Sequence, residues 1–122
     1  MEVNLLKNDR IENLLGLAQK ARMLQAGTEL AEKALLHGKG KLLLLASDAA
    51  EEVHQNFLRL CKNRRVPVMI FSDKITLGAC IGKAPRTALL VLDRGFADAI
   101  IKEVRQVNEN GLENVEVVEW PK

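Results

Sequence analysis

Basic side chains gather around two glycine-containing turns of this sequence, and the chemistry available to them is the binding of phosphate. A helix that begins at Thr28, directly after Gly27, would point unpaired backbone N–H groups and the positive end of its dipole toward an anion. The second turn begins at Gly82. The basic residues that accompany the two turns are Lys20, Arg22, Lys33, Lys39, Lys41, Lys83 and Arg86. Each alone is typical of a solvated surface charge, so a phosphate site requires the two turns to lie together.

A nucleotide-binding phosphate loop is one alternative, and the sequence argues against it. Gly78 to Lys83 is one residue shorter than the G-x-x-x-x-G-K pattern, and Ala84 stands where Ser or Thr would bind magnesium. The segment also lies between an expected helix and an expected strand, whereas the motif needs the strand first.

Acid–base catalysis is another alternative, because Asp48, Asp73 and Asp93 each follow an expected strand. Ligands of open α/β sheets gather at the carboxyl ends of strands. Each aspartate is also a good helix N-cap, and no histidine or serine recurs with them in a nucleophile–base arrangement. We therefore favour capping and expect no catalytic residue.

The cysteines, Cys61 and Cys80, are isolated from each other and from the histidines, His37 and His54. No C-x-x-C or H-x-x-H spacing occurs, so nothing predicts a metal site or a disulfide framework. We interpret the cysteines as buried thiols in a reducing cytoplasm, and we expect neither a metal nor a cofactor.

The chain of 122 residues, 48% of them hydrophobic, is long enough for one domain with its own core. We expect a single domain over residues 1–122, with a core at about 8–107 and an acidic tail at 108–122. Residues 1–97 carry 15 basic and 10 acidic side chains, whereas residues 98–122 carry 3 and 6, which supports an anionic partner for the main body. Aromatic residues make up only 3%, which argues against a stacking platform for single-stranded nucleic acid. The polar start of the chain is unlike a signal peptide, and the longest apolar run, Leu42 to Ala46, is too short to cross a bilayer.

Helical spacing and caps in the first part of the chain predict two helices. The first runs from a cap at Asn8 or Asp9 to about Leu24 and is broken at residues 25–27. The second begins at a Thr28 cap and stops at Gly38. The residues expected to face inward are Ile11, Leu14, Leu15, Ala18 and Ala21 in the first helix, and Leu30, Ala34 and Leu35 in the second.

Three short apolar runs, at residues 41–46, 66–71 and 88–92, predict buried strands. The helices between and after them are expected to begin at caps from Ser47 or Asp48, from Ser72 or Asp73, and near Asp93. The last helix points Phe96, Ala99, Ile100, Val104 and Val107 inward. A turn at Asn110-Gly111 precedes a short edge strand at residues 115–119. Helices alternating with apolar strands predict an α/β protein, a three-layer α/β/α sandwich with a small central mixed sheet.

The order of residues between Gly27 and Asp48 resembles the signature of the kink-turn-binding ribosomal protein superfamily. The matching residues are Gly27-Thr28, Lys33-Ala34-Leu35, Gly38-Lys39, Lys41-Leu42 and Ala46-x-Asp48. Leu77-Gly78-x-x-x-Gly82 followed by Pro85 is similar to a second signature of that superfamily. The resemblance runs from about Ile11 to Val107 and is greatest to the small stand-alone bacterial members of the YlxQ type.

This resemblance implies an α/β/α sandwich without enzymatic activity that grips RNA between the start of the second helix and a nearby loop. In the kink-turn binders an Asn-Glu pair and a Lys one turn later read sheared G·A base pairs. Lys33 matches that Lys, but Glu29 and Leu30 occupy the Asn and Glu positions, and Leu30 makes no hydrogen bond. The residues that the resemblance places at the RNA are Gly27, Thr28, Glu29, Lys33, Lys39, Lys83, Ala84, Pro85 and Arg86.

The expected function is therefore non-enzymatic RNA binding in the cytoplasm, with structured or ribosomal RNA or the ribosome as partner. We expect a monomer without a membrane contact or a small-molecule substrate. The alternative is a protein-interaction adaptor that has kept the fold and lost RNA binding, with Leu30 in an apolar patch near Met23 and Leu24. Cations around Gly27 favour RNA, and a contiguous apolar surface there favours the adaptor.

Overall fold

A five-stranded mixed sheet forms the centre of the computed structural model, which describes residues 9–109 and 115–121. Across the sheet the strands are β1 (Leu24–Ala26), β4 (Ala88–Val91), β2 (Leu42–Leu45), β3 (Val68–Phe71) and β5 (Val115–Val118). β2 and β3 run parallel, and the other neighbouring strands are antiparallel. The carboxyl ends of β1, β2 and β3 therefore lie at the same end of the sheet.

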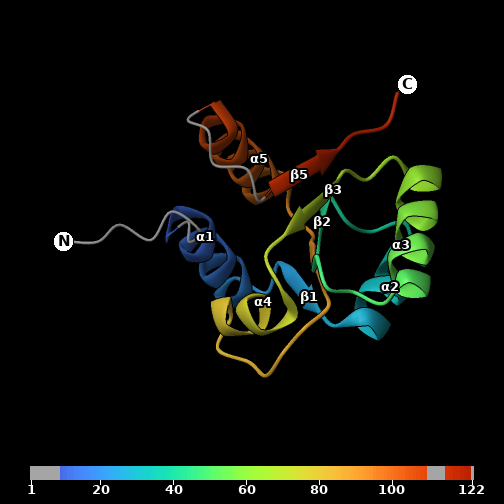
Figure 1. Cartoon of the computed structure of the whole chain (residues 1–122), viewed down its shortest axis with the longest axis horizontal. Coiled ribbons are helices and arrows are strands. Elements are labelled where there is room, and N and C mark those ends of the chain that lie inside the picture. The colour runs from blue at the N-terminus through green and yellow to red at the C-terminus, as the bar shows by residue number, and fades with distance from the viewer. Residues whose placement is uncertain (1–8, 110–114, 122) are drawn as a thin grey trace.

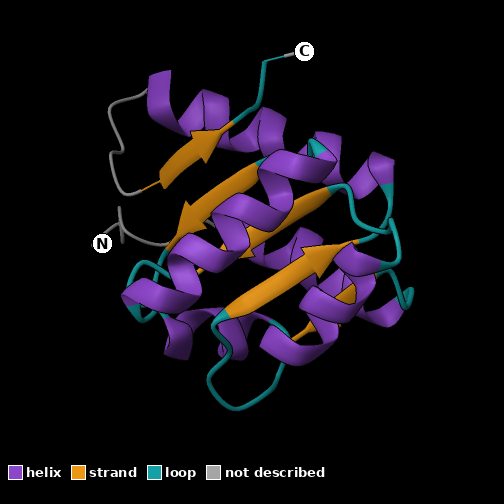
Figure 2. Cartoon of the chain, turned by 90° about the vertical axis from the view of Figure 1, so that its right-hand side faces the viewer, coloured by secondary structure: helices purple, strands orange, loops and turns teal. Residues whose placement is uncertain are grey.

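Helices cover both faces of this sheet, as Figures 1 and 2 show. One face carries α1 (Asp9–Lys20), α4 (Lys74–Cys80) and α5 (Arg94–Glu109), and the other carries α2 (Thr28–Leu36) and α3 (Glu51–Arg64). This arrangement confirms the predicted α/β/α sandwich. None of the described helices is long and apolar enough to span a membrane.

The core consists of two layers, one on each side of the sheet, because successive side chains of a strand point to opposite faces. In β2, Leu42 and Leu44 pack toward α1, while Leu43 and Leu45 pack toward α2 and α3. All four are fully buried. This double burial explains why a run of leucines forms a strand here.

The predicted first helix is too long, because the chain leaves the helix after Lys20. Arg22 adopts a left-handed conformation with φ of 61°. The N–H of Arg22 donates to the Gln19 carbonyl (3.1 Å) and that of Met23 to the Ala18 carbonyl (2.8 Å), the two bonds of a Schellman motif. The following residues form β1, a strand that the sequence analysis missed. Ala21, expected to face inward, is exposed.

Two predicted N-caps are wrong. Gly27, not Thr28, precedes the first turn of α2, and no side chain caps that turn. Ala50 holds the equivalent position before α3, again without a side-chain cap. The Asp48 carboxylate instead accepts from the Lys74 N–H (3.0 Å), at the start of α4.

Ser47, the other expected cap of α3, joins two strand ends instead. Its hydroxyl donates to the Ser72 carbonyl (2.6 Å). The inner side of α2 also differs from the prediction, because Ala31 is buried and Leu30 is 52% exposed.

The caps predicted at Asp73 and Asp93 are confirmed. Asp73 accepts from the Thr76 N–H (2.7 Å), and Asp93 accepts from the Phe96 N–H (3.0 Å). Among the inward residues expected of α5, Ile100 and Val104 are fully buried. The expected cap at Asn8, the side chain of Val107 and the turn at Asn110-Gly111 lie outside what the structure describes.

The described part of the acidic tail packs onto the domain. β5 pairs with β3 and forms one edge of the sheet, as predicted. The indole N–H of Trp120 donates to the Val66 carbonyl (2.7 Å), and Glu119 pairs with Arg105 on α5 (2.5 Å).

Candidate nucleic-acid interface

The first turn of α2 presents backbone N–H groups without a side-chain cap. Gly27 precedes the turn with φ of 108° and ψ of 157°, a conformation that residues with a Cβ rarely adopt. It takes the chain directly from β1 into α2. The dipole of α2 and the uncapped N–H groups of its first turn make this a suitable place for a phosphate.

Glu29, Leu30 and Lys33 form one exposed face that continues from this turn. Residues three and four apart are neighbours on a helix surface, so Lys33 lies one turn beyond both. The helix thus offers a carboxylate, an apolar side chain and an ammonium group side by side.

Loop 82–87 lies directly beside Gly27. The Gly27 N–H donates to the Ala88 carbonyl (2.8 Å), because β1 and β4 pair with Ala26 opposite Leu89. A Cβ on Gly27 would be 3.9 Å from Cδ of Arg86. The structure therefore brings together the two turns whose proximity the phosphate-site hypothesis requires.

Loop 82–87 packs against α4 and is hydrogen-bonded to it. A Cβ on Gly78 would lie 2.7 Å from the carbonyl carbon of Ala84 and closer still to its oxygen, so only glycine fits there. The Lys83 N–H donates to the Gly78 carbonyl (2.9 Å), and the Arg86 N–H donates to the Lys74 carbonyl (3.0 Å). This packing explains why residue 78 is a glycine.

Arg86 shapes the loop as well as charging it. One guanidinium nitrogen donates to the carbonyls of Ala84 (3.0 Å) and Pro85 (3.1 Å). Lys83, Ala84 and Pro85 are exposed around this turn of chain. The loop therefore offers both cations and an exposed apolar segment beside α2.

Lys39 does not join this group. Its N–H donates to the Ala34 carbonyl (2.9 Å) after the last turn of α2, and Lys41 follows beside the end of β4. The rise along α2 from Thr28 to Leu36 is about 12 Å. Of the predicted site residues, the structure thus brings together Gly27, Thr28, Glu29, Lys33 and those of loop 82–87, whereas Lys39 lies at the other end of the helix.

Two neighbours of the loop were missed in the sequence. Lys74 holds the loop through its carbonyl, and Ile75 beside it is 71% exposed. Both lie one turn before Gly78 on α4, and this spacing was the available signal.

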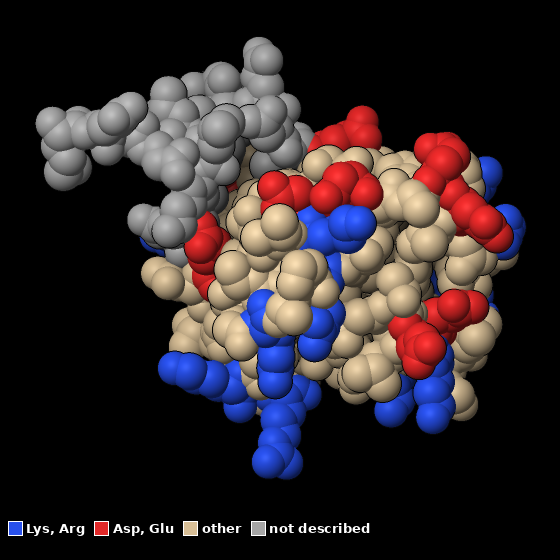
Figure 3. Space-filling view, turned by 60° about the horizontal axis from the view of Figure 1, so that its bottom comes forward, with Lys and Arg blue, Asp and Glu red and all other residues tan. Residues whose placement is uncertain are grey.

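Basic side chains reach the surface on the side of the molecule where this loop lies. Figure 3, in which the underside of Figure 1 comes forward, shows Lys and Arg in the middle and along the lower edge of that face. Asp and Glu lie mainly toward the top and the right of the same view.

The three aspartates that follow strands act as acceptors for helix N–H groups. The Thr76 N–H, through its hydrogen bond, holds the pKa of Asp73 below its usual value of 3.8. This shift makes the carboxylate a poorer proton acceptor near neutral pH, as expected of a cap.

Burial raises the pKa of the Cys61 thiol to about 12, which fits the predicted buried thiol, whereas Cys80 is half-buried. No group of three or more His, Cys, Asp and Glu among the described residues is placed to hold a metal ion.

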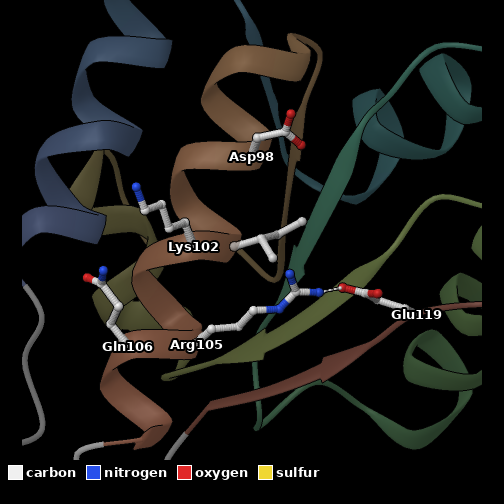
Figure 4. A pocket seen from close by; sticks show the side chains of 6 residues that line it. Asp98, Lys102, Arg105, Gln106 and Glu119 are labelled. Atoms are coloured by element: carbon white, nitrogen blue, oxygen red, sulfur yellow. Dashed lines mark hydrogen bonds and ion pairs between the residues drawn. The ribbon is translucent and has the colours of Figure 1, made fainter.

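A hollow of about 490 Å³ lies away from these aspartates, between α5 and the segment after β5 (Figure 4). The Arg105–Glu119 ion pair forms part of its lining, and Asp98 and Lys102 lie on its α5 side. Its lining comes from neither α2 nor loop 82–87.

A comparison with protein-family models identifies the family. Residues 9–101 match the model of the Ribosomal protein L7Ae/L30e/S12e/Gadd45 family. The chain belongs to this family. The match spans the first four strands and the first half of α5, so it includes both parts of the candidate site.

Two relatives of the L7Ae/L30e family illustrate its character. The RNA-binding protein YlxQ of Bacillus subtilis (strain 168) is 35% identical over 88 residues, which are 72% of this chain and 88% of that protein. The large ribosomal subunit protein eL30 of Methanococcus vannielii is 39% identical over 71 residues, 57% of this chain and 68% of that protein. Their names are those of an RNA-binding protein and a ribosomal protein, not of enzymes.

A solved structure supports the fold independently. A protein of unknown function from Bacillus halodurans C is similar with a TM-score of 0.76 and 33% identity, covering 80% of this chain and 99% of that one.

Proposed function

We propose that this chain is a non-enzymatic RNA-binding protein that binds structured or ribosome-associated RNA at the first turn of α2 and loop 82–87. The observation that carries the proposal is the adjacency of Gly27 and Arg86, which combines an uncapped helix N-terminus with a basic loop. Family membership supports RNA as the anion, and a ribosome-associated role would place the protein in the cytoplasm.

Phosphate contacts carry most of the binding in this proposal. Gly27 and Thr28 let the RNA backbone approach the N–H groups of α2, and Lys33 and Lys83 neutralise neighbouring phosphates. Glu29 accepts a hydrogen bond from an exocyclic base amine. Leu30 is exposed and apolar, so it contributes contact area without reading a base edge.

The loop supplies the other side of the grip. Ala84 and Pro85 are exposed and apolar, which suits them to pack against an extruded base. Arg86 fixes the shape of the loop through two backbone carbonyls and places its aliphatic stem over Gly27.

A protein-interaction adaptor is the second candidate, because two large apolar side chains are exposed near the same end of the sheet. Leu30 on α2 is 52% exposed and Ile75 on α4 is 71% exposed. The adaptor gains support if no RNA affects the residues around Gly27.

Backbone amide chemical shifts measured during an RNA titration test the proposed site. We expect the largest changes at residues 27–30 and 83–87 when a structured RNA is added. Changes confined to other segments of the folded protein would contradict the proposed site.

A further inference from the structure

The end of the sheet opposite the candidate interface is strongly basic. There β2 and β3 begin, β4 ends and α1, α2 and α3 finish, as the main-chain bonds show: the Lys41 N–H donates to Val91, and the Leu92 N–H donates to Met23. We call this surface the basic end. Its exposed cations are Lys20, Arg22, Lys39, Lys41, Lys62, Arg65 and Arg94.

These cations are not neutralised by the acidic residues around them. The ion pairs found among the described residues, Arg10–Glu103 and Arg105–Glu119, involve none of the seven. Asp93 is next to Arg94 in the chain and accepts a hydrogen bond from the Phe96 N–H (3.0 Å), and its single negative charge offsets at most one of the seven cations. The basic end therefore has a surplus of exposed positive charge.

Helix dipoles account for only part of this charge. Cations are favourable at the last turn of a helix, and Lys20 and Lys62 fit that role. Lys39 and Lys41 follow α2 after its Schellman turn, and Arg94 is at the start of α5, where a cation is disfavoured.

Two arginines are kept at this end against a backbone preference. Arg22 and Arg65 have φ of 61° and 57°, in the left-handed position that ends α1 and α3. Gly38, at φ of 76°, holds the same position after α2, in the same pattern of two closing hydrogen bonds. Glycine is the residue that fits this conformation without strain. Strained residues of this kind point to a function for their side chains.

Four of these cations stand at successive strands and form a row across the sheet. Arg22 precedes β1, Arg94 follows β4, Lys41 precedes β2, and Arg65 lies shortly before β3. Since β1, β4, β2 and β3 are consecutive in the sheet, the row spans three strand spacings, about 14 Å. This length matches several successive phosphates of one strand of a nucleic acid.

We propose that the basic end is a second RNA-backbone-binding surface, separate from the first turn of α2 and loop 82–87. This proposal rests on the proposed function, from which RNA is taken as the polyanion. The two surfaces lie at opposite ends of α2, so one molecule can hold two RNA segments at once.

The test compares variants for binding to a plain RNA duplex over a range of salt concentrations. The double variant Arg22→Gly, Arg65→Gly removes two cations and relieves two strained backbones. We expect its thermal unfolding midpoint to be equal to or above that of the parent, its affinity to fall several-fold, and its salt slope to fall by about two units.

The matched control is Arg59→Gln, Lys102→Gln, which removes two exposed cations from α3 and α5. We expect this control to keep nearly the parental slope. Equal slopes for the two double variants, or a lowered unfolding midpoint together with unchanged RNA binding in the glycine variant, would overturn the proposal. In the second case the arginines would serve only to end their helices.

Adding Lys33→Ala separates this proposal from the proposed function. If Lys33→Ala leaves RNA binding intact while the glycine variant weakens it, the basic end stands and the α2 site fails. If the reverse holds, the α2 site stands and the basic end fails. If the parent protein binds no RNA, both fail.

Discussion

Lys33 is the cation of α2 that shares an exposed face with residues of its first turn. It lies on the exposed face shared with Glu29 and Leu30, and its carbonyl accepts a hydrogen bond from the His37 ring (2.7 Å). The ion pairs found among the described residues do not involve its ammonium group, which would therefore be available to a phosphate at the helix start.

Replacing Lys33 by alanine tests this role. We expect weaker RNA binding and a salt slope lower by about one unit, because one phosphate contact is lost. The measurement is the binding constant as a function of salt. Lys102→Ala, on the other face of the sheet, is the control, and equal slopes for the two variants would remove Lys33 from the site.

Gly27 tests the approach of the RNA backbone. We expect Gly27→Val to lower RNA affinity by about tenfold or more, about 1.4 kcal/mol, because valine at this φ distorts the turn and crowds the N–H groups. Gly38→Val is the matched control for the loss of stability, because Gly38 also has a positive φ but lies at the other end of α2 with open space around it.

Both glycine variants should lose stability, and circular dichroism shows whether they remain folded. Parental RNA affinity in a folded Gly27→Val protein would contradict the role of the turn as a phosphate cradle.

At the scale of elements, most helices and strands could be predicted because their apolar residues recur with a clear period. The runs at residues 41–46, 66–71 and 88–92 contain β2, β3 and β4. β1 was missed because three residues are too few to show alternation and a left-handed turn at Arg22 hides the helix end.

That missed strand limited the site prediction as well. The pairing of β1 with β4 places loop 82–87 beside Gly27, and no local pattern encodes this contact. The sequence therefore named the candidate residues, and the structure was needed to show that Arg86 lies beside Gly27 while Lys39 lies apart.

The seat of loop 82–87 on α4 gives a prediction at this scale. Gly78→Ala would place a methyl group 2.7 Å from the carbonyl carbon of Ala84, far inside van der Waals contact, so either the loop or α4 must move. We expect a loss of about 1–3 kcal/mol in unfolding free energy and weaker RNA binding. Denaturant unfolding and RNA titration measure the two effects.

Gly16→Ala is the control for that substitution. The added Cβ would lie 3.8 Å from the carbonyl oxygen of Cys80, which is an ordinary van der Waals contact. We expect unchanged or slightly greater stability, by up to about 1 kcal/mol, and parental RNA binding. Equal behaviour of the two variants would show that the loop does not depend on Gly78.

At the scale of the whole molecule, the C-terminal strand closes the sheet beside β3. The indole N–H of Trp120, two residues after this strand, donates a hydrogen bond to the Val66 carbonyl. We expect Trp120→Phe to cost about 1 kcal/mol of unfolding free energy through the lost hydrogen bond, with no change in RNA binding at the α2 site, since β5 lies at the edge of the sheet farthest from β1. Denaturant unfolding followed by circular dichroism measures the change in unfolding free energy. A change in RNA affinity would show that the tail takes part in binding.

The chain as a whole thus carries an uncapped helix start beside a basic loop at one end of its sheet and a row of cations at the other. Family membership and this geometry together make RNA the expected partner.

The most direct test of RNA binding at the α2 site is a titration with a kink-turn RNA and with a plain duplex of equal length, each at low and moderate salt. We predict binding to both RNAs with a strong salt dependence and tighter binding to the kink-turn RNA. Absence of binding to either RNA at low salt would contradict the account and favour the adaptor.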